Sequence, residues 1–76
     1  MILPNKYVRH KESIIGLGAL ILKQLNKPRT VSYLWEYARG IPEVGTYLRF
    51  NLTMDFLFAI NLIEFHNGLI RKVSKK

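Results

Sequence analysis

The chain contains no cysteine and few acidic residues, and both shortages narrow the functions it can have. Without cysteine there is no disulfide framework, no thiolate metal site and no cysteine nucleophile. The chain has five acidic and twelve basic residues, which gives a formal net charge of +7. This basic excess favours nucleic acid or an acidic protein surface as partner. Alternatively, the charge serves only to keep a small apolar protein in solution.

Long hydrophobic runs are also missing. The longest apolar stretches are far too short to span a membrane, and residues 1–4 do not begin an apolar core of signal-peptide length. We therefore expect no membrane segment, and the lack of cysteine fits a cytoplasmic protein. Nevertheless, 49% of the residues are hydrophobic, which is high for a globular domain. So small a chain cannot bury all of these side chains, which indicates an interface.

No residue pattern points to catalysis. The two histidines, His10 and His66, have no metal-ligand cluster around them in the sequence. The acidic residues are scattered, and the chain has no glycine-rich phosphate loop and no serine-nucleophile motif. We therefore expect a protein that is not an enzyme and uses no cofactor or metal.

Turn residues and hydrophobic spacing predict an arm and two helices in the first half of the chain. Residues 1–11 are predicted to form an extended arm that contains Pro4. A first helix is predicted over residues 12–25, before Pro28. Thr30 is suited to cap a second helix over residues 31–39, which Gly40 ends before a turn at 40–45. The side chains expected to face inward recur at helical spacing: Ile14, Ile15, Leu17, Ile21, Leu22, Leu25, Val31, Leu34, Trp35 and Ala38.

The second half of the chain predicts a helix followed by a hairpin. The helix is expected over residues 46–60, with a stop at Asn61. Strands over residues 63–66 and 69–73 flank Asn67 and Gly68, a residue pair preferred in type I′ hairpin turns. The predicted fold is mainly α with a C-terminal β-hairpin. It is a winged helix-turn-helix with three helices plus the wing, and residues 1–76 form one domain.

The third predicted helix has two apolar sides. At 100° per residue, the side assigned to the core groups five large residues: Tyr47, Phe50, Met54, Leu57 and Phe58. The opposite side groups mostly apolar residues as well: Leu48, Leu52, Asp55, Phe56, Ala59 and Ile63. In DNA-binding winged helices this helix enters the major groove with polar side chains. Here the outer side favours a protein partner, because only Arg49 and Asn51 suit base edges.

Two groups of residues are candidates for binding. The candidate protein-interface residues are Leu48, Leu52 and Phe56, together with Ile2 and Leu3 at the tip of the arm. The alternative is that the two sides are rotated, or that Ile2 and Leu3 fold back over Leu52 and Phe56. The candidate contacts to DNA phosphate are basic residues of the wing, the tail, the third helix and the arm: Arg71, Lys72, Lys75, Lys76, Arg49, Lys6, Arg9 and Lys11. The wing lysines could instead only guard an edge strand against aggregation.

Several segments carry a family resemblance. They are L-P-N-K-Y-V-R at residues 3–9, E-S-I-I-G-L-G-A at 12–19, K-P-R-T-V at 27–31 with Leu34-Trp35, and D-F-L-F-A at 55–59 before L-I-E at 62–64. Over nearly its full length the chain resembles the small middle components of bacterial ABC-three-component systems, in the subtype numbered six. It departs from the family pattern at Ser32, where an acidic residue is usual, and at Asn61, where glycine is frequent.

The resemblance implies a role as an adaptor. Such proteins look like links between an ABC ATPase of the SMC or Rad50 type and an effector, often a nuclease. Their systems, which include Lamassu-type ones, are associated with defence against phages and plasmids. The resemblance supplies no catalytic residues. Two alternatives stay open: an antitoxin-like protein, and a dimeric sequence-specific DNA-binding regulator with the apolar side as homodimer interface and DNA contacts from Arg49, Asn51, Arg71 and Lys72.

Overall fold

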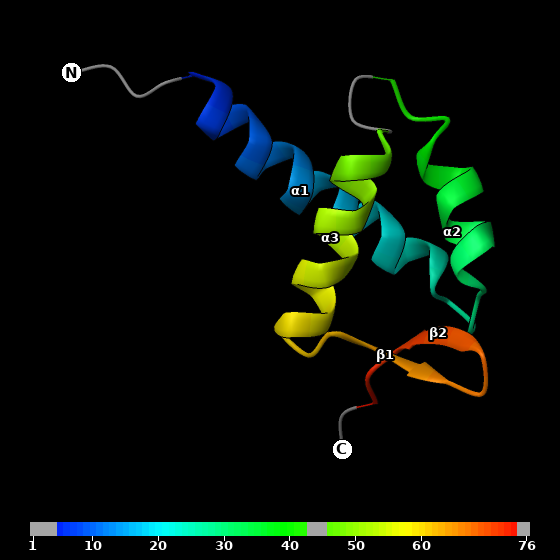
Figure 1. Ribbon diagram of the computed structural model, residues 1–76. Helices are drawn as coiled ribbons and strands as arrows, with labels where there is room; N and C mark the ends of the chain where they lie inside the picture. Colours follow the sequence, from blue (N-terminus) through cyan, green and yellow to red (C-terminus); the bar gives the residue numbers. More distant parts are fainter. Residues whose placement is uncertain (1–4, 43–45, 75–76) are drawn as a thin grey trace.

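The computed structural model describes residues 5–42 and 46–74, with side chains from residue 14 onward. The elements in chain order are α1 (Asn5–Gln24), α2 (Val31–Ala38), α3 (Tyr47–Ala59), β1 (Ile63–His66) and β2 (Leu69–Lys72). Figure 1 shows α3 crossing in front of α1, with α2 beside them and the hairpin across one end. The fold is mainly α with a C-terminal hairpin and is winged-helix-like, as predicted. Part of the predicted 40–45 turn falls outside the described residues.

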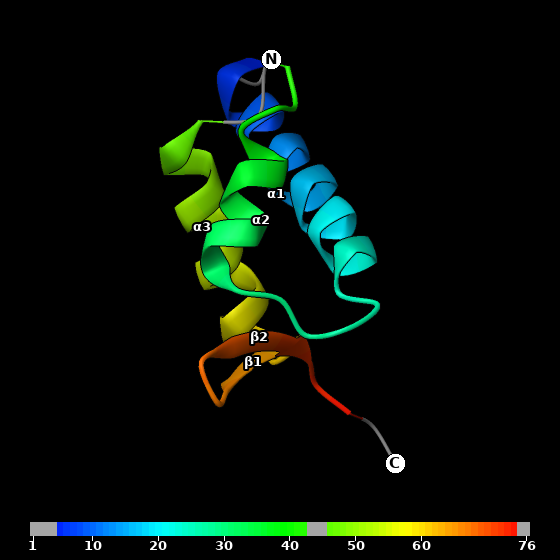
Figure 2. The same cartoon turned by 90° about the vertical axis from the view of Figure 1, so that its right-hand side faces the viewer.

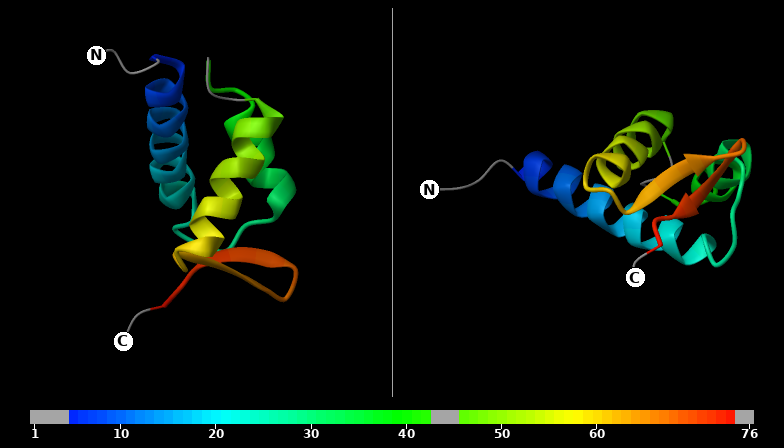
Figure 3. Two further views of the ribbon diagram at one scale, coloured as in Figure 1. Left: turned by 60° about the vertical axis from the view of Figure 1, so that its left-hand side comes forward. Right: turned by 90° about the horizontal axis from the view of Figure 1, so that it is seen from below.

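The start of α1 corrects the predicted extended arm. The helix begins at Asn5, so residues 5–11 are helical, and only residues 1–4 of the arm lie outside the described part. Lysine and arginine are good helix formers, and adding residues to an existing helix costs little once its packed half has formed. The sequence analysis missed this extension because residues 5–11 show no inward apolar stripe. The first turns of α1 project beyond the other helices (Figures 1 and 3).

Threonine caps set the starts of α2 and α3. The Thr30 hydroxyl oxygen accepts a hydrogen bond from the Tyr33 backbone N–H at 3.0 Å, and the Thr46 oxygen accepts one from Arg49 N–H at 3.2 Å. Both bonds satisfy backbone donors that the first helical turn leaves unpaired. Asn61 follows α3 with φ 65°, the left-handed conformation that ends a helix. The predicted cap at Thr30 and the stop at Asn61 are confirmed.

The hairpin has the predicted register and turn. β1 and β2 pair antiparallel from Ile63 opposite Lys72 to His66 opposite Leu69. Asn67 and Gly68 have φ 53° and 79°, as the two central positions of a type I′ turn require. In Figure 2 the hairpin lies beneath the three helices and closes that end of the core.

The link between α1 and α2 supplies a third sheet partner that the sequence analysis missed. Arg29 forms an isolated antiparallel bridge with Ile70, through N–H···O bonds of 2.9 Å and 2.6 Å. β2 therefore lies between β1 and the link. The Arg29 Nε donates to the Gln24 carbonyl at 3.0 Å, and its guanidinium lies 4.3 Å from the centre of the Tyr33 ring. This one residue joins the end of α1, the start of α2 and the wing.

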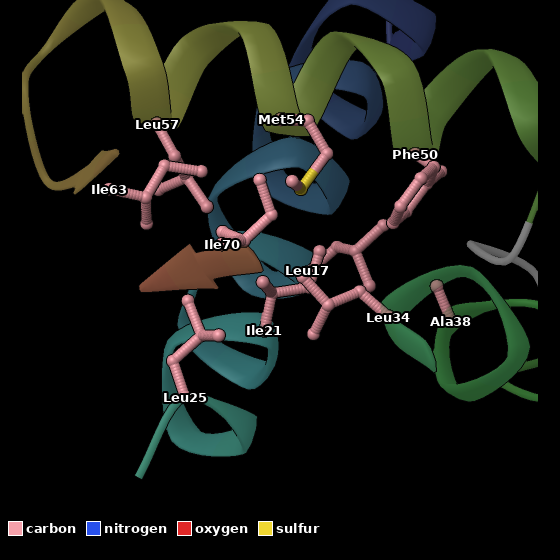
Figure 4. Packing of buried hydrophobic residues seen from close by; sticks show 10 residues of the cluster. All are labelled: Leu17, Ile21, Leu25, Leu34, Ala38, Phe50, Met54, Leu57, Ile63 and Ile70. Atoms are coloured by element: carbon pink, nitrogen blue, oxygen red, sulfur yellow. The ribbon is translucent and has the colours of Figure 1, made fainter. Parts of the chain in front are cut away.

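The core fills the space between the three helices and the hairpin (Figure 4). Its members come from every element: Leu17, Ile21, Leu25, Leu34, Ala38, Phe50, Met54, Leu57, Ile63 and Ile70. Gly18 lets α1 approach α3, since a Cβ there would lie 3.4 Å from Leu57 Cδ2 and 3.6 Å from Thr53 Cγ2. The small size of Gly18 therefore allows the two helices to pack closely at this point.

Some residues assigned to the interior are exposed instead. Tyr47 and Phe58 are 61% and 39% exposed, and Ile15 and Val31 are 62% and 44% exposed. All four lie at the edges of their stripes, where a small domain has no further element to cover them. Ile63 belongs to β1, as the predicted strand over residues 63–66 has it, and it is buried, so its grouping with the outer side of α3 was wrong.

Candidate protein interface

The outer side of α3 carries a row of exposed apolar side chains. Leu48, Leu52 and Phe56 are 65%, 40% and 40% exposed. Four-residue spacing places them above one another along roughly 12 Å of helix, and we call them the outer stripe. Their exposure agrees with the outer side that the sequence predicts, while Tyr47 and Phe58, assigned to the core side, are exposed as well. That the three residues form an interface stays a prediction. The alternative cover, Ile2 and Leu3, lies outside the described residues.

The outer stripe is open because the described neighbours of α3 pack on its other side. α1 meets α3 through Gly18, which faces Thr53 and Leu57. α2 meets it through Trp35, whose ring centre lies 5.4 Å from that of Phe50. In Figure 1 one long side of α3 faces the viewer with no other element in front. The stripe therefore lies opposite the core.

A further exposed apolar residue follows the outer stripe along α3. Ile60 at the C-cap of α3 is 46% exposed and comes four residues after Phe56. On α1, Ile15 is 62% exposed, three residues before Gly18, which packs against α3. The prediction had assigned Ile15 to the core stripe and Ile60 to the helix end.

Aromatic rings continue the apolar surface toward α2. Tyr47 contacts Trp35 edge-on, with ring centres 5.1 Å apart, and Trp35 is half-buried. Edge-to-face contacts of this kind stabilise an aromatic pair beyond the area it buries. Tyr47 was assigned to the core but lies at its rim. Its exposed ring therefore adds to the apolar surface of α3.

The polar side chains of α3 are poorly suited to reading DNA bases. The helix holds one basic residue, Arg49, which is half-buried, and one acid, Asp55, which is exposed. Asn51 is exposed as well. Major-groove readers usually direct three or four polar side chains to base edges, and a carboxylate repels phosphate. The exposed side of α3 therefore fits a protein better than a DNA groove.

The wing presents less free positive charge than the sequence suggests. Arg71 Nε lies 2.6 Å from Glu64 Oε2, and the two residues are opposite each other in the hairpin. Lys72 is exposed and makes no ion pair with any described residue. Phe65 is 62% exposed on β1.

The remaining candidate DNA contacts lie at opposite ends of the chain. Lys75 and Lys76 lie outside the described residues. Lys6, Arg9 and Lys11 belong to the first half of α1, and their side chains are outside the description. These three residues lie toward the end of α1 that is far from the hairpin (Figure 1).

The described residues hold no group of three or more histidine, aspartate or glutamate side chains that could bind a metal ion. None of the helices within the described ranges is long and apolar enough to cross a membrane.

Residues 3–73 match the family described as ABC-three component (ABC-3C) system Middle Component 6. The chain belongs to this family. The match spans all three helices and the hairpin, so it covers both α3 and the wing. No curated protein and no solved structure shows a significant match to this middle component. A middle component is one subunit of a multi-subunit system, so this protein has partner subunits.

Proposed function

We propose that this middle component is a non-catalytic adaptor between an SMC/Rad50-like ABC ATPase and an effector subunit such as a nuclease. Its setting would be a cytoplasmic, Lamassu-type system that defends bacteria against phages and plasmids. Family membership supports a role among partner subunits. The observation that carries the proposal is the outer stripe, which is apolar where a DNA-reading helix would be polar.

Burial of the outer stripe would supply much of the docking energy. Full burial of one leucine or phenylalanine side chain stabilises by about 1.5–3 kcal/mol, and the three stripe residues are only partly buried in the free chain. Large apolar side chains at helical spacing are the usual anchors of a helix in a partner groove. Left uncovered, such a patch favours aggregation. The outer stripe is therefore the surface that we assign to the ATPase or the effector.

In the same complex, basic side chains outside α3 would contact DNA held by the ATPase without reading its sequence. Phosphate contacts need only suitably placed cations. Asp55 and the apolar stripe make α3 itself unsuitable for this task.

The docking proposal is tested by the double variant Leu52→Asp, Phe56→Asp. The full-length variant is co-expressed with a tagged ATPase and effector encoded beside it. We expect co-purification to fall at least about 100-fold, because two carboxylates would be desolvated in an apolar contact. The variant alone should retain its helical circular dichroism and cooperative unfolding, since both replaced side chains are substantially exposed.

A matched control is Phe65→Asp. It also replaces an exposed apolar residue by aspartate, but on the hairpin instead of α3. This control should co-purify like the wild type. Unchanged co-purification of the double variant, or its unfolding, would contradict docking through the outer stripe. A homodimer that the double variant dissociates, with nanomolar sequence-dependent DNA binding, would instead support the dimeric regulator.

A further inference from the structure

Among the described side chains, positive charge is concentrated at the end of the molecule that carries the hairpin. Five basic residues belong to the last turn of α1, the link and β2: Lys23, Lys27, Arg29, Arg71 and Lys72. The acidic residue at this end is Glu64 on β1. The charges of the other described side chains cancel, because Arg39 and Arg49 are matched in number by Glu36 and Asp55. The net positive charge of the described side chains therefore lies entirely at this end.

Hydrogen bonds of Arg29, one from its side chain and two from its backbone, bring these three segments together. Arg29 bonds to the Gln24 carbonyl at the end of α1 and pairs with Ile70 in β2. Lys23 precedes Gln24, while Lys27 and Lys72 each stand two residues from the Arg29–Ile70 bridge. Figures 1 and 2 show the end of α1, the link and the hairpin meeting at the same end of the molecule.

The basic residues here divide into engaged and free ones. Arg71 is paired with Glu64 at 2.6 Å. Arg29 is engaged with the Gln24 carbonyl and with Asn26 Oδ1 at 3.1 Å. Lys23, Lys27 and Lys72 are exposed and form no ion pair with the described residues. We call these three lysines the wing-end lysines.

We infer that the wing-end lysines form a binding surface for the phosphodiester backbone of duplex DNA. Lysine is depleted at protein–protein interfaces, which favour aromatic residues and arginine. In contrast, sequence-independent DNA binding comes mainly from lysine and arginine charges on phosphates. Of the proposed function, this inference rests only on the claim that basic side chains contact DNA. It does not require docking through the outer stripe, so the DNA contact and the docking can each be disproved without the other.

This inference also separates two groups of basic residues. Arg9 and Lys23 are fourteen residues apart in one helix, which corresponds to about 21 Å. Lys6, Arg9 and Lys11 therefore form a group that is separated along α1 from the wing-end lysines. Lys23 and Lys27 were not among the candidate contacts drawn from the sequence, because only the fold brings the link and the end of α1 to the end of the molecule that carries the hairpin.

The test compares two triple variants of the full chain. One replaces Lys23, Lys27 and Lys72 by glutamine, and the control replaces Lys6, Arg9 and Lys11 by glutamine. Each lowers the net charge by three. Affinity for a labelled 20-base-pair duplex is measured by fluorescence anisotropy at several salt concentrations. We expect the wing-end variant to bind at least roughly tenfold more weakly and its salt slope to fall by about two to three units. The control should remain within about threefold of the wild type.

A third variant excludes loss of folding as the cause. Replacement of the three wing-end lysines by arginine keeps the charge and should keep the affinity within about twofold. Equal losses in both glutamine variants, a larger loss in the control, or no duplex binding by the wild type would overturn the inference. Strong preference for one base sequence would also overturn it. The wing-end variant should still co-purify with the ATPase, which separates this result from docking.

Discussion

The two faces of α3 both carry large apolar side chains, but one face is buried in the core and the other is exposed. Phe50 is 1% exposed, while Phe56, six residues later in the same helix, is 40% exposed. Leu57 and Leu48 differ in the same way, at 2% and 65%. Both faces are apolar, so hydrophobicity does not distinguish them. The difference is that α1, α2 and the hairpin all pack against one face, and nothing described covers the other.

The comparison explains why a winged-helix-like fold can serve as a subunit interface. One face of α3 holds the domain together, and the second face is available to a partner. The wing end differs from both, because its exposed side chains include three lysines that form no ion pair within the described part of the chain. Apolar and charged contacts therefore lie on separate surfaces and can be altered separately.

The largest expected effect comes from the matched substitutions Phe50→Ala and Phe56→Ala. Phe50→Ala removes a buried ring that packs against Trp35, and should lower the free energy of unfolding by about 3–5 kcal/mol. Phe56→Ala should lower it by about 1 kcal/mol or less, since its ring is substantially exposed. Urea unfolding followed by circular dichroism measures both values. Equal losses would show that the two faces are equally covered in the isolated protein.

A second pair tests how α1 packs on the buried face. Gly18→Leu places a side chain against Leu57 and Thr53, and should lower stability by about 1–3 kcal/mol through overpacking. Gly16→Leu is the control in the same helix, because a Cβ at Gly16 meets nothing within 4 Å. It should raise stability by about 0.5–1 kcal/mol through helix propensity. The thermal unfolding midpoints of the two variants are compared with that of the wild type. A higher midpoint for Gly18→Leu would contradict the close packing of α1 on α3.

Thr53→Val tests the one polar member of the buried face. Thr53 is completely buried, and its hydroxyl has no hydrogen-bond partner among the described residues. Valine has the same shape without the hydroxyl, so we expect the free energy of unfolding to rise by about 1 kcal/mol. Thr53→Ser, which keeps the hydroxyl and loses a methyl group, should lower it instead. Calorimetry of the two variants measures the contrast. Destabilisation by valine would mean that the hydroxyl is hydrogen-bonded.

The smallest effect is expected at the wing. The Arg71–Glu64 pair is short, at 2.6 Å, but its side chains are 41% and 38% exposed. A double-mutant cycle with Arg71→Gln and Glu64→Gln should give a coupling energy of about 0.5 kcal/mol, which declines as salt is added. A coupling well above 1 kcal/mol would show that the wing is less solvated than its exposure indicates.

The sequence predicted the elements whose signals are local. Thr30 and Asn67-Gly68 act through hydrogen bonds or backbone conformations within a few residues, so their roles follow from residue type. The outer stripe was also predictable, because three large apolar residues at four-residue spacing must share a side. Its partner was not, since nothing in the chain identifies what covers it.

The errors concern features that depend on neighbouring elements. The start of α1 at Asn5 was missed because residues 5–11 show no apolar stripe at helical spacing in the sequence. Tyr47 and Phe58 were assigned to the core because periodicity gives the direction of a side chain but not the reach of α2. The Arg29–Ile70 bridge joins residues far apart in sequence, so no local signal could indicate it.

The sequence alone determined that α3 is apolar around most of its circumference and that a hairpin follows it. These properties depend on residue type and spacing. Only the tertiary structure decided how far the buried face extends, which leaves Tyr47 and Phe58 exposed, and that the link lies beside the wing. A small domain has too few elements to surround α3, so packing covers one face and leaves the outer stripe exposed. The Arg29–Ile70 pairing likewise brings the link that carries Lys27 to the hairpin, across an interval that no local pattern spans.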